Sequence, residues 1–304
     1  MKFRVAGVVT ALLLVITSIA PIANAVDHQN GQINVRWSTS NMYLNSTSYL
    51  EQEFIPTENG AFIDGAQFKW TNAYHLDFCW QGTGSLTSSG ERCGFVGVGL
   101  GSKNGSNYFG NFDFAIFNGT DFSINRNEPN VFCDKRVEAG YIGNSQTWYL
   151  PCWKGVILQM GTPYVLRVQW DSSNTTNDNN WWSASLINKK TNETVTVGKI
   201  KTVANSYTEP LSSIQTVVFY NGEAKACDAI PVIDLRVAKP KSGSNSANYL
   251  SQWLAPCVRA LSAASNEFPG YYSIRLGGAN PETREPGYVK TPEPTPSATP
   301  KESA

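Results

Sequence analysis

Two acidic residues on one predicted strand are the clearest candidates for catalytic chemistry. Glu51 and Glu53 alternate with Leu50 and Gln52, so a strand would place both carboxylates on one face. Glycoside hydrolysis uses such a pair, with the carboxyl groups roughly 5–9.5 Å apart across the scissile bond. The E-x-D-x-x-E strand motif of sandwich glucanases is absent from the chain, and solvated charge is the usual reason for alternating Glu. A polysaccharide-cleaving enzyme using this pair is therefore an alternative hypothesis.

The remaining acids and histidines indicate no hydrolase triad. Asp77 and Asp113 lie in apolar strand patterns, where burial would raise the pKa of a carboxyl group, although structural hydrogen bonding accounts for them equally well. His28 and His75 are the two histidines of the chain. No G-x-S-x-G elbow accompanies His75, so a catalytic serine is not indicated.

Metal-binding patterns are equally sparse. The polar loop between Asp171 and Asn180 contains Asp178 and offers oxygen ligands that calcium accepts, but it lacks the acidic spacing of an EF-hand. No two cysteines form a C-x-x-C pair, which argues against zinc or thiol-redox chemistry. We expect no cofactor. The loop between Asp171 and Asn180 has ligands suitable for calcium, but no calcium-binding motif supports such a site.

Aromatic side chains give the more informative signal, with nine Trp, thirteen Tyr and fourteen Phe. Trp181 and Trp182 are neighbours, so on a strand only one of them can enter the core. The other would offer a flat apolar platform to a pyranose ring, with Gln169 and Asn180 as hydrogen-bonding partners, and Trp153 is a further candidate. The alternative for each Trp is that it fills the space between sheets.

Short β-rich stretches separated by Gly, Asn, Ser and Thr must position these residues. Tyr164, Leu166, Val168 and Trp170 fall on one face of a predicted strand, as a period of two requires. Such spacing predicts an all-β antiparallel sandwich of the jelly-roll kind. The predicted strands are Ile33–Ser38, Ser48–Ile55, Ala66–Trp80, Gly94–Leu100, Asn107–Phe117, Thr147–Leu150, Pro163–Asp171, Trp181–Asn188, Glu193–Ile200, Ser213–Tyr220 and Val232–Ala238.

One stretch has helical rather than strand spacing. Between Tyr249 and Ala264, Leu250, Trp253 and Leu254 begin an apolar pattern that predicts a short peripheral helix. No linker interrupts the strands, so residues 26–278 are predicted to form a single domain.

Six cysteines in an exported chain predict three disulfides. Six thiols allow fifteen pairings, and proximity in the sequence favours the three local ones. These pairs are Cys79–Cys93, Cys133–Cys152 and Cys227–Cys257.

The two ends of the chain differ in composition from its body. Residues 1–25 combine Lys2 and Arg4 with an apolar run and end in Ala23-Asn24-Ala25, which predicts a cleaved signal peptide and secretion. Its removal leaves 22 basic and 24 acidic residues, a net charge of −2, which argues against nucleic acid and polybasic membrane contact. No later segment is apolar enough to insert in a membrane. Residues 279–304 are rich in Pro, Glu and Thr and predict a disordered tail.

Several of these stretches together resemble a secreted family, the domain of unknown function numbered thirty-four seventy-two. The likeness runs over roughly Tyr49–Tyr220. It is carried by Tyr49–Glu51, Gly94–Leu100, Phe112–Phe117, Cys133, Tyr149–Trp153, Tyr164–Trp170, Trp181–Ser185 and Val197–Ile200. It implies a concanavalin-type sandwich and no established reaction. Where that family tends to show Gly-Tyr-x-Gly-Ile-Gln, this chain has Gly-Phe-Val-Gly-Val-Gly from Gly94, so no functional residue is transferred.

The sequence therefore favours a secreted, non-catalytic carbohydrate-binding or cell-surface protein with an aromatic platform near Trp181 and Trp182. An enzyme using Glu51 and Glu53 remains one alternative. A structural or adhesive sandwich that binds another protein through a sheet face is the other. The sequence leaves the oligomeric state open.

Overall fold

The computed structural model describes residues 31–45, 49–59, 72–81, 91–104, 107–117, 119–124, 130–142, 145–171, 180–202, 208–220, 227, 230, 232–255, 257–258, 261–263, 269–277 and 287–289. The expected signal peptide, Asp178 and the tail apart from residues 287–289 lie outside these ranges. Within them, no helix is long and apolar enough to cross a membrane.

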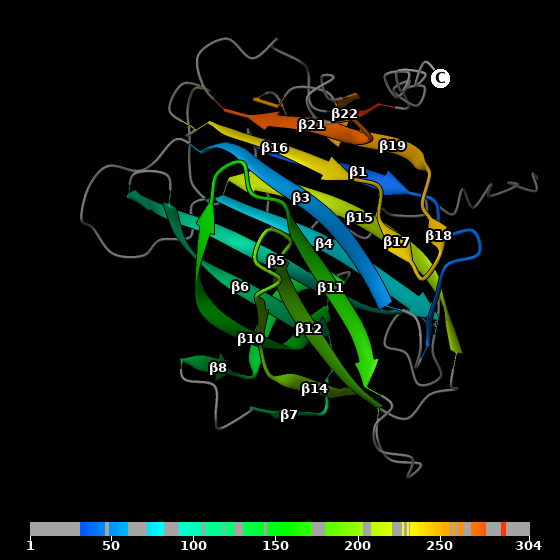
Figure 1. The fold of residues 1–304 in the computed structure, drawn as a ribbon. Coiled ribbons are helices and arrows are strands. Elements are labelled where there is room, and N and C mark those ends of the chain that lie inside the picture. The colour runs from blue at the N-terminus through cyan, green and yellow to red at the C-terminus, as the bar shows by residue number, and fades with distance from the viewer. Residues whose placement is uncertain are drawn as a thin grey trace, which may run out of the picture.

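Two β-sheets pack face to face and form the sandwich that the sequence predicts (Figure 1). The first sheet runs in the order β22 (Gly287–Val289), β19 (Tyr249–Leu254), β1 (Gln32–Trp37), β15 (Thr208–Tyr220), β4 (Asn72–Gln81), β5 (Glu91–Asn104), β6 (Asn107–Phe117), β10 (Ser145–Gln159) and β8 (Val131–Cys133), with β2 (Tyr43–Asn45) beside β15 and β9 (Arg136–Ile142) beside β10.

The second sheet lies in front of the first in Figure 1. Its order is β20 (Ser262–Ala263), β21 (Tyr271–Leu276), β16 (Ile233–Ala238), β3 (Tyr49–Asn59), β11 (Tyr164–Asp171), β12 (Asn180–Asn188), β14 (Lys199–Thr202) and β7 (Asp121–Ser123), with β13 (Thr194–Thr196) beside β12, β17 (Lys241–Ser242) beside β3, and β18 (Asn245–Ser246) beside β17. The central strands of both sheets pair antiparallel.

Alternation along the strands supplies the core between the sheets. The predicted inner face of β11 is buried at Tyr164, Leu166, Val168 and Trp170, and one continuous cluster of buried side chains draws on both sheets. Aromatic rings cross the interface, as where the Trp182 ring packs on the Trp80 ring with centroids 4.8 Å apart. Burial of these large apolar surfaces is the main force that holds the sheets together.

A buried polar network also joins the two sheets. The Gln52 Oε1 on β3 accepts hydrogen bonds from the Tyr74 hydroxyl on β4 at 2.8 Å and from the Thr216 hydroxyl on β15 at 2.9 Å. The Thr216 hydroxyl in turn accepts a hydrogen bond from Trp37 Nε1 at 2.8 Å, while Gln52 Nε2 donates to the Ala238 carbonyl at 2.8 Å. Gln52, Tyr74 and Thr216 are each 0% exposed, so the bonds between side chains in this network are buried in the core.

The helix predicted between Tyr249 and Ala264 is wrong. Residues Tyr249–Leu254 form β19, which pairs antiparallel with β1. Leu250 is 52% exposed, whereas a helix would bury it with Leu254 one turn away. The strand conformation buries the polar residues Ser251 and Gln252. Pairing with β1 supplies hydrogen bonds to the backbone of this segment, and the Leu261 N–H donates to Gln252 Oε1 at 2.8 Å.

Part of the predicted tail also belongs to the first sheet. Gly287–Val289 form β22 and pair with Gln252–Leu254 at the edge. An edge strand offers unpaired N–H and C=O groups that a short extended segment can satisfy without contributing apolar side chains. Composition alone therefore missed these three residues.

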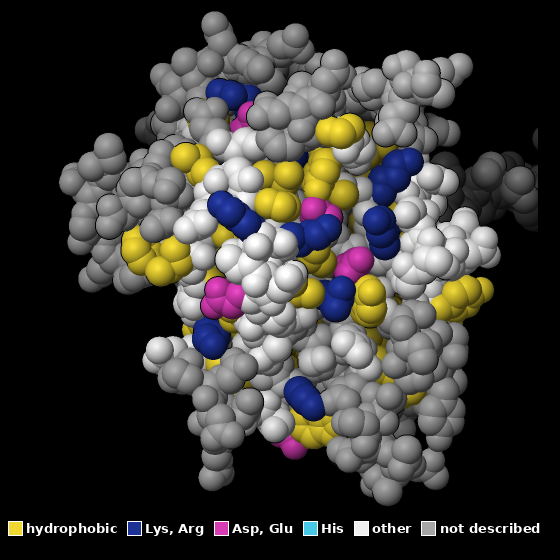
Figure 2. Space-filling model, viewed as in Figure 1, with side chains coloured by type: hydrophobic (Ala, Val, Ile, Leu, Met, Phe, Trp, Pro, Cys, Tyr) yellow, Lys and Arg dark blue, Asp and Glu magenta, His cyan; other side chains and the backbone are white. Residues whose placement is uncertain are grey.

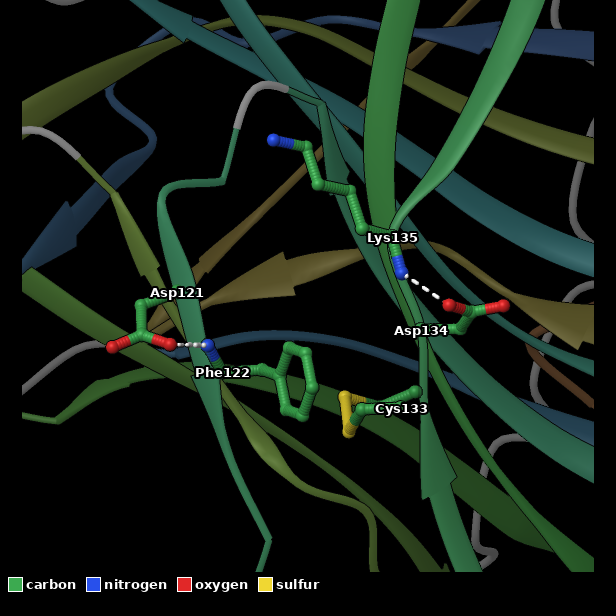
Figure 3. The surroundings of a disulfide bond; sticks show 6 residues. Asp121, Phe122, Cys133, Asp134 and Lys135 are labelled. Carbon is green, nitrogen blue, oxygen red and sulfur yellow. Dashed lines mark hydrogen bonds between the residues drawn. A yellow bond between two sulfur atoms is a disulfide. The ribbon is translucent and has the colours of Figure 1, made fainter.

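All three predicted disulfides are confirmed. Cys79–Cys93 links directly opposed residues of β4 and β5, and Cys133–Cys152 links opposed residues of β8 and β10. Cys227–Cys257 is the third. In Figure 3 the Phe122 ring on β7 points toward the Cys133 disulfide. A Cβ on Gly198 would lie 2.7 Å from Cys133 Sγ, so this glycine lets the second sheet pack against the bridge.

Candidate functional site

A shallow cavity of about 210 Å³ lies on the outer face of the second sheet. We call it the outer groove, and β3, β11, β12 and the segment around β17 contribute to it. Figure 2 views the molecule from this side and shows basic and acidic side chains interleaved over the middle of the face. The lining residues are Glu51, Glu53, Val165, Arg167, Ile187, Lys189, Asn192, Ala238, Lys239 and Lys241.

Glu51 lies between two cations in the groove. Antiparallel pairing places Arg167 of β11 opposite it on one side and Lys241 of β17 on the other. Arg167 Nη2 and Nε donate to Glu51 Oε2 at 2.9 and 3.2 Å. The guanidinium also lies 3.9 Å from the centroid of the Tyr49 ring, and this cation–π contact holds it flat against the sheet.

Glu53, two residues along β3, is held in a similar way. Lys189 Nζ lies 3.1 Å from its Oε2, and the Tyr271 hydroxyl donates to its Oε1 at 2.5 Å. Burial, followed by the hydrogen bond to Glu53, raises the pKa of Tyr271, so the phenol remains a donor at neutral pH. The structure therefore brings the predicted acid pair together, with a positive partner for each carboxylate.

Apolar side chains form part of the groove floor. Val165 and Ile187 are directly opposed on β11 and β12, and Val165 is 7% exposed. Charged and amide groups thus surround a small apolar surface. A sugar ring, which has C–H faces and peripheral hydroxyls, matches this arrangement of surfaces.

The two neighbouring tryptophans separate as the strand period requires. Trp182 is 3% exposed in the core and donates from Nε1 to the Thr202 hydroxyl at 3.1 Å. Trp181 faces outward and is half-buried, on the same side of the sheet as the outer groove. Gln169 is exposed on that face, whereas of Asn180 only the backbone, paired with Thr202, is described.

Trp153 lies on the other face of the sandwich. It belongs to β10 in the first sheet, where its ring stacks on Phe132 with centroids 6.0 Å apart. Phe132 is 54% exposed. Of the three candidate tryptophans, Trp182 therefore lies in the core, while Trp181 and Trp153 lie on opposite faces of the sandwich.

The acids at positions 77 and 113 lie on the outer face of the first sheet. His75 Nε2 lies 3.9 Å from Asp113 Oδ2, across Gly97 of the intervening strand. A Cβ on Gly97 would lie 2.2 Å from His75 Cδ2, so only glycine allows the imidazole to lie over β5. The His75 ring also stacks on Phe95, with centroids 4.6 Å apart.

Burial raises the pKa of Asp77 to about 7 and that of Asp113 to about 8. Among the described residues, neither Asp77 Oδ1 nor Asp113 Oδ1 has a hydrogen-bond partner. The cavity beside Asp77 measures only about 20 Å³, roughly the space that one water molecule needs. The cavity beside Asp77 is therefore too small for a sugar. The raised pKa values of Asp77 and Asp113 instead affect the stability of the fold.

Replacing Asp113 by asparagine should flatten the pH dependence of stability. The carboxyl titrates near 4 when unfolded and at about 8 in the fold, so its contribution is complete below about pH 4 and is lost as the pH rises to about 8. In Asp113→Asn the free energy of unfolding should fall less steeply across this window, by up to about 1.4 kcal/mol per pH unit. Urea denaturation at several pH values measures the slope.

Two further polar residues on this face, Asp77 and His75, need their own controls. Asp77→Asn should flatten the same profile in the same direction, and His75→Gln removes the facing imidazole. Asp121→Asn, at an exposed position on β7, should leave the slope unchanged. An unaltered slope in Asp113→Asn would show that the carboxyl is ionised in the fold.

No family model matches this chain, and the search among curated proteins finds no match either.

Proposed function

We propose that this protein is a secreted, non-catalytic carbohydrate-binding sandwich of the concanavalin-like jelly-roll type, and that it binds glycans through the outer face of its second sheet. The observation that carries the proposal is the outer groove, in which an apolar floor is surrounded by ion-paired carboxylates and cations. The resemblance to the secreted family of unknown function is kept as part of this proposal.

Aromatic rings on the same face support a ligand longer than one sugar. Trp181 is four residues along β12 from Ser185, which is opposite Arg167. At the rise of a strand this distance is about 13 Å. A glycan chain that lies in the groove would extend over the Trp181 indole, and a monosaccharide would not reach both.

The ion pairs favour binding over hydrolysis. A glycosidase acid is held protonated by apolar surroundings, whereas Arg167 and Lys189 contact the two carboxylates directly. Ionised carboxylates held in this way readily accept hydrogen bonds from sugar hydroxyls. The enzyme alternative using Glu51 and Glu53 loses support for this reason.

Three disulfides support export to an oxidising compartment. Together with the apolar leader they favour a secreted or cell-surface location. In the adhesive alternative a sheet face binds another protein. That alternative predicts that the protein binds no polysaccharide.

Replacing Trp181 by alanine should weaken glycan binding without unfolding the protein. Loss of a half-buried aromatic anchor at a binding hot spot costs more than about 1 kcal/mol, so retention on the best ligand of a polysaccharide panel should fall at least about fivefold. Affinity electrophoresis measures retention, and released reducing ends are recorded in the same samples.

Trp153→Ala is the matched control, because this half-buried indole lies on the opposite face. It should leave retention unchanged. Release of reducing ends that disappears in Glu51→Gln or Glu53→Gln would overturn the proposal in favour of an enzyme. Retention on no polysaccharide would also overturn it.

A further inference from the structure

One edge of the first sheet ends in an open stretch of strand β10. On the side of β10 away from β6, β9 pairs with Ser145–Tyr149 and β8 pairs with Cys152–Lys154. No described strand pairs with the next residues, Gly155–Gln159, on that side, whereas β6 pairs with them on the other. An open edge of this kind presents backbone N–H and C=O groups to another strand.

The alternation of the backbone shows which groups point to the open edge. The Cα atoms of Cys133 on β8 and Cys152 on β10 are 4.1 Å apart. So short a separation is typical of opposed residues that do not hydrogen-bond to each other, and the backbone groups of Cys152 therefore face β6. By alternation, the N–H and C=O groups of Gly155 and Ile157 face the open edge. We call these four the edge groups.

The end of β10 leaves the edge groups accessible. The Gln159 N–H donates to the Tyr164 hydroxyl at 2.8 Å rather than to β6, which agrees with the same alternation. The Gly161 N–H then donates to the Pro56 carbonyl on β3 at 2.8 Å, so the chain crosses to the second sheet directly after β10. Among the described residues, the edge groups have no hydrogen-bond partner.

The side chains at this edge leave both a projection and a gap. Ile157 is 56% exposed, the highest value among the large apolar side chains of the described residues. Two positions earlier, Gly155 is exposed, and a Cβ added there would meet no atom within 4 Å. Both residues lie on the outer face of the sheet, since Leu158 faces the core. Lysines and prolines usually protect an edge from pairing, and Gly155–Gln159 contains neither.

We propose that two copies of this chain pair through their β10 edges, antiparallel and about a twofold axis at Val156. Gly155 then lies opposite the partner's Ile157 on both sides of the axis, and the isoleucine fills the gap above the glycine. Opposed residues of this type exchange both N–H···O bonds, so the edge groups of the two copies satisfy each other. One partner occupies the whole open stretch, and assembly stops at a closed dimer.

The pairing places two outer grooves on one side of the dimer. The two first sheets become one continuous sheet, and the twofold axis is perpendicular to it. Both second sheets then lie on the same side, and their outer grooves face the same way. A long ligand or a coated surface can be held at two points, which strengthens binding without any new contact. Pairing itself does not depend on what the outer groove binds.

Sedimentation velocity of the purified protein, from about 1 µM to about 1 mM, measures the pairing. A small interface is weak, so we expect a dimer that dissociates on dilution. Ile157→Lys should raise the dissociation constant at least about tenfold, because a lysine on an edge opposes pairing. Leu250→Lys is the matched control, since Leu250 is 52% exposed on β19, and it should leave the dissociation constant unchanged.

Gly155→Val distinguishes this pairing from general association of apolar surface. The valine has open space in a single copy and adds apolar surface, so non-specific association should increase. In the proposed register, however, it collides with the partner's Ile157. We therefore expect the Gly155→Val protein to be monomeric across the same concentrations, with no loss of thermal stability.

Three results would overturn the proposal. The unaltered protein could remain monomeric throughout the concentration range. A dimer could persist in Ile157→Lys or in Gly155→Val, in which case another surface holds it. Oligomers larger than a dimer would contradict the closed twofold arrangement.

Discussion

Replacing Gln52 by leucine should lower the free energy of unfolding by about 2–6 kcal/mol. The substitution keeps the size of the side chain but removes the acceptor of the Tyr74 and Thr216 hydroxyls in the core. Each buried donor left without a partner costs about 1–3 kcal/mol. The urea midpoint of unfolding measures the effect, with an unchanged m-value showing that the transition itself is the same.

Two further variants distinguish the loss of the hydrogen-bond network from the effect of introducing a leucine. Gln169→Leu makes the same change at an exposed position on β11, where the cost should be within about 0.5 kcal/mol. Gln52→Leu/Tyr74→Phe also removes the Tyr74 hydroxyl that Gln52→Leu leaves without an acceptor. The double variant should be more stable than Gln52→Leu alone, because removing both partners of a buried hydrogen bond costs less than leaving one partner unsatisfied. If the double variant is less stable than the single one, the network does not supply the stabilisation.

Replacing Trp182 by alanine should cost about 3–5 kcal/mol, in the range measured for large aromatic truncations in cores. Its ring packs on Trp80 of the opposite sheet, and its Nε1–H donates to Thr202. Alanine would leave a cavity between the sheets and remove the hydrogen bond from Nε1 to the Thr202 hydroxyl. Thermal and urea denaturation both report the loss.

Trp181→Ala is the natural comparison, since it removes the same side chain one residue earlier. That indole faces outward on the strand, so its loss should cost well under half as much. Equal destabilisation by the two substitutions would mean that both indoles contribute to the core, and the proposed binding role of Trp181 would lose its basis.

The sequence predicts the strands best where one face alone is buried. Strict alternation identified β11 and β12 nearly to the residue, because period-two burial is a local property. The same reasoning truncated β10, predicted as Thr147–Leu150 and observed as Ser145–Gln159. Pro151 and Gly155 interrupt its pattern, yet β6 pairs with it from Tyr149 to Gln159, and this tertiary pairing is invisible in the sequence.

The candidate site was predicted only in part, for a related reason. Period two placed Glu51 and Glu53 on one face and Arg167 on the outer face of its own strand. That β3 pairs with β11, and therefore that Arg167 contacts Glu51, depends on strand order. Lys189, Lys241 and Tyr271 come from three more elements, and no spacing in the chain relates them.

The pairing of the cysteines has a consequence for how the protein is made. The bridged residues are separated by 14, 19 and 30 positions, and each pair is complete before the next begins. If the chain is exported N-terminus first, as proposed above, its thiols reach the oxidising compartment two at a time. The first partner that each cysteine meets is then the native one, so an oxidase alone can complete the bridges and an isomerase has little to correct.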